Sequence, residues 1–187
     1  MKCFVAAVML TAASAAAAAA GESCDYGKAH PDAPPEMSQY AFLIGDYRIE
    51  ARAWRDGSWT EGFQAARWNG RYILGGMAIM DEWFDSPPDE DPSTIRGVNI
   101  RMYNPETERW HLMWQYTKDK AVTELSSKVE TDGKMHLDWV PPKPDRKIWF
   151  EVYGPGHWAR LDHRKNEKTG KFEPKYKLEA FRVPCKE

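Results

Sequence analysis

The sequence has 187 residues, of which 42% are hydrophobic and 13% aromatic, with nine tryptophans and a formal net charge of −2. This length suits one domain with a sizeable core, and the absence of a basic cluster argues against a nucleic-acid-binding surface. Nine tryptophans in so small a chain indicate a large apolar interior, a pocket lined by rings, or both.

Residues 1–20 have the pattern of a secretory signal peptide. Lys2 supplies a positive charge, residues 4–13 are apolar, and the alanines of 15–20 offer A-x-A cleavage sites. A membrane anchor is the alternative, but the strongly apolar part is too short for a span. We therefore expect cleavage just before Gly21 or Glu22, and a periplasmic or secreted mature protein.

Cleavage would remove Cys3 and leave Cys24 and Cys185, which lie near the two ends of the mature chain. In an oxidising compartment such a pair is expected to form a disulfide; two buried free thiols are the alternative. A disulfide would withdraw both thiols from catalysis.

Residues 21–39 are polar and rich in proline, which predicts an extended leader, and residues 40–187 form the predicted domain. A short helical turn is expected over 37–43, followed by a first strand over 47–54 with alternating side chains. Asp56-Gly57 predicts a hairpin into a strand over 58–68, and Asn69-Gly70 predicts a second hairpin.

A long third strand is expected over 71–84, with a bulge at Gly75-Gly76. An acidic loop follows at 85–91; we expect it to be a solvated portal loop, since it lacks the ligand alternation of a calcium loop. Seven further strands are predicted between turn-forming residues, over 95–103, 109–117, 122–130, 135–140, 147–153, 157–164 and 176–182.

About ten strands joined by short turns predict an all-β fold, an antiparallel up-and-down barrel, because closure removes exposed sheet edges. A barrel of this size has room for one small ligand. A two-sheet sandwich with a filled core is the alternative.

The chain resembles the calycin superfamily of lipocalin-like barrels, and more closely an exported bacterial family of that fold with no assigned function. Three motifs carry the resemblance, over residues 40–182: Gly45-Asp46-Tyr47, Leu74-Gly75-Gly76 and the turn at 103–107. The family has Trp where this chain has Tyr47. The resemblance implies that this ring plugs one barrel end under an arginine of the last strand, here Arg182.

Six residues are the ligand-binding candidates, because alternation along their strands places them on the same face as inward side chains or on an aromatic face. Plain core packing is the alternative for the aromatic face, and solvation is the alternative for the arginine. The candidates are Gln64, Trp68, Arg101, Tyr103, Trp114 and Tyr116.

No cofactor, metal or catalytic motif is expected. His111 and Met113 share a strand face, as haem or copper ligands do, but this spacing also arises by chance. The leading interpretation is therefore a container for a small apolar or aromatic molecule. An enzyme using the same cavity, with Glu124 as one candidate group, is an alternative.

A further alternative is an envelope interaction module without a ligand. It would use the outer face that carries Trp54, Trp59 and Phe63, and it predicts a contiguous exposed aromatic patch.

Overall fold

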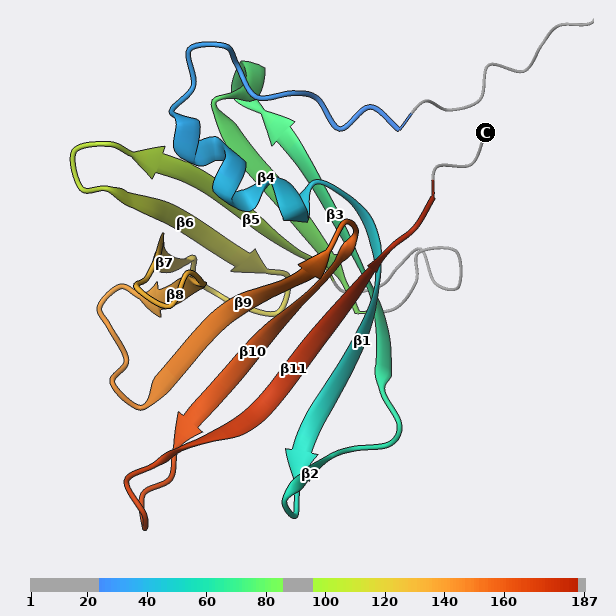
Figure 1. Ribbon diagram of the computed structural model, residues 1–187, viewed down its shortest axis with the longest axis vertical. Helices are drawn as coiled ribbons and strands as arrows, with labels where there is room; N and C mark the ends of the chain where they lie inside the picture. Colours follow the sequence, from blue (N-terminus) through green and yellow to red (C-terminus); the bar gives the residue numbers. More distant parts are fainter. Residues whose placement is uncertain (1–23, 86–95, 185–187) are drawn as a thin grey trace, which may run out of the picture.

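The computed structural model describes residues 24–85 and 96–184. Antiparallel strands in sequence order form one sheet, and β11 pairs with β1 to close ten of them into a barrel (Figure 1). The elements are η1 (Pro35–Leu43), β1 (Gly45–Arg55), β2 (Ser58–Trp59), β3 (Gln64–Ile73), η2 (Leu74–Gly76), β4 (Ala78–Phe84), β5 (Arg96–Asn104), β6 (Arg109–Tyr116), β7 (Thr123–Val129), β8 (Met135–Trp139), β9 (Arg146–Gly154), β10 (His157–Lys165) and β11 (Phe172–Arg182). The predicted all-β up-and-down barrel is confirmed, and the sandwich alternative is wrong.

The predicted second hairpin at Asn69-Gly70 is wrong, because both residues lie inside β3. The chain turns instead at η2, where Leu74, Gly75 and Gly76 all have positive φ angles of 51°, 65° and 93°. Gly70 serves a different purpose: a Cβ there would lie 2.0 Å from the carbonyl oxygen of Leu43. The glycine therefore permits a close backbone approach and not a turn.

The turn at 56–57 forms as predicted, but the register beyond it shifts. Residues 60–63 leave the sheet, so that Ala51 pairs with Gln64. An uninterrupted two-residue hairpin would have paired Ala51 with Gly62. Because the shift is an even number of residues, Gln64 and Trp68 keep their predicted inward face.

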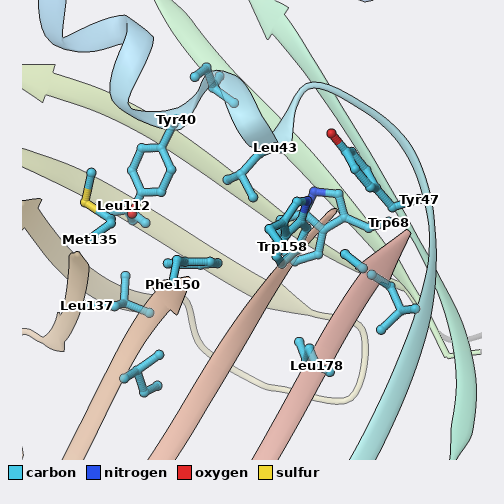
Figure 2. Close-up of a cluster of buried hydrophobic side chains, with 14 of the residues drawn as sticks. Tyr40, Leu43, Tyr47, Trp68, Leu112, Met135, Leu137, Phe150, Trp158 and Leu178 are labelled. Carbon is cyan, nitrogen blue, oxygen red and sulfur yellow. The ribbon is translucent and has the colours of Figure 1, made fainter. Parts of the chain in front are cut away.

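The helix η1 closes one end of the barrel (Figure 1). Met37, Tyr40 and Leu43 are spaced three apart, which places them on one face of a 3₁₀-helix, and all three are buried. Figure 2 shows Tyr40 and Leu43 pointing from this helix into the barrel, toward Phe150 and Trp158. The Tyr40 hydroxyl lies 2.7 Å from the hydroxyl of Ser127, so its polar group is satisfied.

Tyr47 lies at the same end and is 1% exposed. Its hydroxyl donates to the carbonyl of Phe42 at 2.6 Å, and the Arg182 guanidinium lies 6.0 Å from its ring centroid. Gly45 has a φ of 130°, and a Cβ there would lie 2.9 Å from Arg182. The Tyr47 ring thus lies beneath an arginine of the last strand, in the arrangement that the resemblance implies.

The leader and the end of β11 run to the same side of the barrel (Figure 1). Both are anchored at Asp46: the Tyr26 hydroxyl donates to its carboxylate at 2.9 Å, and the Val183 amide donates to its carbonyl at 2.8 Å. Cys24 opens the described leader, whereas Cys185 lies outside the described residues, so the Cys24–Cys185 disulfide stays a prediction. The signal peptide, residues 1–20, also lies outside them.

No helix in the described part of the chain has the length and apolarity needed to cross a membrane.

Candidate functional site

A cavity of about 500 Å³ lies inside the barrel. This volume falls within the range of small-molecule sites. Seven aromatic rings line the cavity, together with four aliphatic side chains and eight other polar or charged side chains. The lining rings are Trp68, Trp83, Trp114, Trp139, Phe150, Tyr116 and Tyr176.

Five of the six ligand-binding candidates line this cavity: Gln64, Trp68, Arg101, Trp114 and Tyr116. The sixth, Tyr103, is not among the lining residues. It shares the inward face of Arg101 but lies nearer the closed end, where its ring packs edge-on against Trp110 at 5.7 Å.

The side chains of β6 alternate between buried and exposed positions, and this places its rings on the inner face of the barrel. Trp110 and Leu112 are buried in the core, and the next two inward positions, Trp114 and Tyr116, reach the cavity. Trp114 needs space against the neighbouring strand: a Cβ on Gly97 of β5 would lie 2.1 Å from its six-membered ring. The absence of a side chain at Gly97 therefore allows the Trp114 ring to pack directly against the β5 backbone.

Arg101 forms a buried ion pair with Asp81, with 2.6 Å between Arg101 Nε and Asp81 Oδ1. The two side chains are 2% and 1% exposed, so the expected alternative of a solvated arginine is wrong. Burial acts to lower the pKa of Arg101, but Asp81 and Tyr40 together outweigh it, so that the pKa is raised. The guanidinium also lies over the Tyr40 ring, 4.6 Å from its centroid.

Five buried polar atoms of lining residues have no hydrogen-bond partner within the described chain: Arg101 Nη1, Asn99 Oδ1, Trp68 Nε1, Arg160 Nε and Asp162 Oδ1. The last two lie 3.3 Å apart as an ion pair. Buried polar groups are normally satisfied, so the wall is unusual in this respect.

Carboxylates mark the other end of the cavity. Asp85 accepts a hydrogen bond from Trp83 Nε1 at 2.6 Å and a second from the Tyr116 hydroxyl. Burial, followed by the hydrogen bond to Asp85, raises the pKa of Tyr116 to about 12. Asp119 in the β6–β7 loop lines the same cavity. The rest of the predicted loop at 85–91 lies outside the described residues.

Three of the weaker candidates point away from the cavity. His111 and Met113 are exposed on the outer face of β6, and His111 contacts the Thr107 hydroxyl at 3.2 Å. Glu124 is exposed and pairs with Met113 across the outer face of β7, so it cannot act inside the barrel. Within 24–85 and 96–184, no three His, Cys, Asp or Glu side chains gather as metal ligands would.

The outer aromatic face is partly covered. Trp54 and Trp59 are half-buried and pack edge-to-face at 5.0 Å. Lys177 lies over Trp59 at 5.7 Å, and Arg52 lies over Phe63 at 5.2 Å. Of these three rings only Phe63 is exposed, so the contiguous patch required by an interaction module is missing.

Sequence reasoning missed six of the eight polar or charged residues of the lining other than tyrosine. Asp85, Asn99, Asp119, Thr123, Arg160 and Asp162 were not among the candidates. The alternation of β10 places Arg160 and Asp162 two apart on its inward face, which is the signal that could have identified them.

The sequence matches no family model and no curated protein. Among solved structures, the fold is similar to that of an S-type phycobiliprotein lyase from Guillardia theta, with a TM-score of 0.50 and 11% identity. The match covers 80% of this chain and 93% of the lyase. At this identity the likeness supports the calycin-like barrel fold alone.

Proposed function

We propose that the protein is an exported barrel that binds a small apolar or aromatic molecule in its central cavity. The observation that carries this proposal is the cavity of about 500 Å³ lined by four tryptophans. Tryptophan rings offer large apolar area at a low entropic cost, and they stack on planar ligands. The cavity lies in the interior of a closed barrel, which is where proteins of this architecture hold ligands.

The composition of the wall supports a ligand and not a filled core. Eight polar or charged residues share the wall with the rings, among them Gln64, Asn99 and Asp119, whereas a core formed only by packing is mostly apolar. The similar barrel of the phycobiliprotein lyase is consistent with a chamber for a small molecule, although the likeness of 11% identity extends to the fold only.

An enzyme that uses the same cavity needs two adjacent ionisable groups facing the ligand. Arg160 with Asp162, and Tyr116 with Asp85, are two such pairs in the cavity wall. The enzyme alternative therefore uses these pairs and not Glu124, and the aromatic lining is the observation that favours binding.

The proposal includes export and the Cys24–Cys185 disulfide. The signal-peptide pattern at residues 1–20 and the resemblance to the exported calycin-like family both support export, and an oxidising compartment favours the disulfide. Fractionation of the native host, followed by intact-mass measurement, tests export. The expected product lacks residues 1–20 or 1–21 and is lighter than its reduced form by two hydrogen atoms. A full-length cytoplasmic product would contradict it.

Tryptophan fluorescence titration against a panel of apolar and aromatic compounds tests binding. We expect saturable quenching or a spectral shift, because four of the nine tryptophans line the cavity. Thr123→Trp places a bulky ring on the cavity wall and should abolish the response. Met113→Trp adds the same ring to the exposed outer face of the adjacent strand and should preserve it. Equal behaviour of the two variants would contradict binding in the barrel.

A further inference from the structure

The two arginines of the cavity wall are already neutralised. Arg101 is paired with Asp81 at 2.6 Å, and Arg160 Nε lies 3.3 Å from Asp162 Oδ1. Each guanidinium therefore has a carboxylate beside it, and the wall offers no uncompensated positive charge. An anionic ligand would have to compete with these built-in partners.

Two further carboxylates line the cavity without a cation. Asp85 receives its hydrogen bonds from neutral donors, the Trp83 indole and the Tyr116 hydroxyl. The Asp119 carboxylate has neither a hydrogen bond nor an ion pair within the described ranges. The fixed charges of the lining, counted with Asp81, are therefore negative overall.

These two carboxylates act on the same part of the cavity. After burial and the hydrogen bond to Asp85, the charges of Asp85 and Asp119 both contribute to the raised pKa of Tyr116. The pKa of Tyr176 is raised mainly by burial; the charge of Arg160 lowers it, and the charges of Asp162 and, to a smaller extent, Asp85 raise it. Both phenols line the cavity, so its acidic region borders on aromatic rings.

The rings beside these carboxylates are suited to a cation. Trp114 and Tyr116 lie nearly parallel, with centroids 6.1 Å apart and an angle of 15° between their planes. The faces of such rings attract cations. One ring of the wall, Trp139, already contacts two cations that are not part of the lining: the Arg146 guanidinium lies 4.9 Å from its ring centroid, and Lys143 lies 5.2 Å from it.

Cationic residues near this region do not replace the missing counter-charge. Lys118 and Lys120 flank Asp119 in the chain, but neither lines the cavity. The Arg96 guanidinium lies over the Phe84 ring at 4.9 Å and is likewise not part of the lining.

We propose that the cavity selects organic cations. The apolar body of the ligand would lie among the tryptophans, and its ammonium group would lie against Trp114 and Tyr116 near Asp85 and Asp119. This inference rests on the proposed binding function and specifies the charge class of the ligand.

Three probes with one ring system test the charge selectivity: 2-naphthyltrimethylammonium, its neutral isostere 2-tert-butylnaphthalene, and 2-naphthoate. Equilibrium dialysis should show the cation binding about tenfold more tightly than the isostere, with the anion weakest. Equal or tighter binding of the neutral or anionic probe overturns the inference while the binding function stands. If none of the three probes binds and no compound of the fluorescence panel binds, both the charge selectivity and the proposed binding function are contradicted.

Asp119→Asn tests the charge without breaking a hydrogen bond of that side chain. It should weaken cation binding about fivefold and leave the isostere unaffected. The matched control is Glu106→Gln, an exposed carboxylate in the β5–β6 turn at the other end of β6. In the wild-type protein, raising the salt concentration to about 1 M should weaken the binding of the cationic probe and leave the binding of the neutral isostere unchanged. Unchanged cation binding in Asp119→Asn and in high salt contradicts the proposal.

Discussion

Arg101 and Asp81 form an ion pair inside the barrel, with 2.6 Å between Arg101 Nε and Asp81 Oδ1 and with both side chains buried. Their β-strand positions explain the contact. Ile79 is the cross-strand partner of Arg101, and Asp81 lies two residues farther along β4 on the next inward position. The pair is therefore a consequence of the β4–β5 register.

Asp81→Asn should destabilise the protein strongly, because it leaves the Arg101 charge buried without a counter-charge. We expect a loss of about 3–5 kcal/mol in the free energy of unfolding, measured by urea denaturation. The double variant Asp81→Asn with Arg101→Met removes that charge and should recover part of the loss. If the double variant is less stable than Asp81→Asn alone, the ion-pair explanation does not hold.

Gly97→Ala should force the Trp114 ring off the β5 backbone, since the new Cβ would overlap its six-membered ring. Such overpacking costs about 1–3 kcal/mol, and ligand binding should weaken as well. Trp114→Phe removes the overlapping atoms. Combined with Gly97→Ala, it should give a loss smaller than the sum of the single losses, which a double-mutant cycle by thermal denaturation would measure. Strict additivity would contradict the steric explanation.

Tyr47→Phe should lower stability without changing ligand affinity. It removes the hydroxyl that donates to the Phe42 carbonyl at 2.6 Å, with an expected cost of about 1–2 kcal/mol. Tyr47 does not line the cavity, so the fluorescence titration should give the same affinity as the wild type. A loss of affinity comparable to that of a lining variant would show that the closed end also shapes the site.

Tyr116 should titrate near pH 12 and not near pH 10, because burial and Asp85 both favour the neutral phenol. Its pKa is raised on folding, so its contribution to stability is complete below about pH 10 and is lost as the pH rises toward 12. Tyrosine ring-carbon NMR measures the titration, and Tyr116→Phe assigns the resonance. Asp85→Asn should move this pKa downward.

Tyr153 provides an internal reference for that experiment. Its pKa is also raised to about 12, but by burial and by a hydrogen bond to Glu151. Asp85→Asn should therefore leave Tyr153 unchanged. An equal shift of both resonances would indicate a global change in the fold and not a local effect of Asp85.

Alternation and turn chemistry were sufficient to predict the barrel and five of its lining residues. Strand faces follow from a period of two, and Asp56-Gly57 formed the expected turn. The same reasoning failed at Asn69-Gly70, because a glycine that permits backbone contact with Leu43 looks identical in sequence to a turn glycine. Local signals do not reveal which distant backbone will approach.

Most of the polar lining could not be predicted for a related reason. For Arg101, a ligand-binding candidate, the sequence left the solvated alternative open, since nothing nearby in the sequence marks Asp81 as its partner. Their pairing depends on the register of two strands separated by residues 85–95. Cavity volume is likewise a property of how ten strands pack together, so sequence alone left the choice between a filled core and a chamber open.

Native mass spectrometry of the protein purified from its own host tests the central claim most directly, because a bound molecule would identify itself by its mass. We expect a one-to-one adduct on the wild-type protein and on Met113→Trp, lost in Thr123→Trp, with a mass that fits a cavity of about 500 Å³. An adduct retained by Thr123→Trp, or a wild-type protein that carries no adduct and binds nothing in the fluorescence panel, would contradict it.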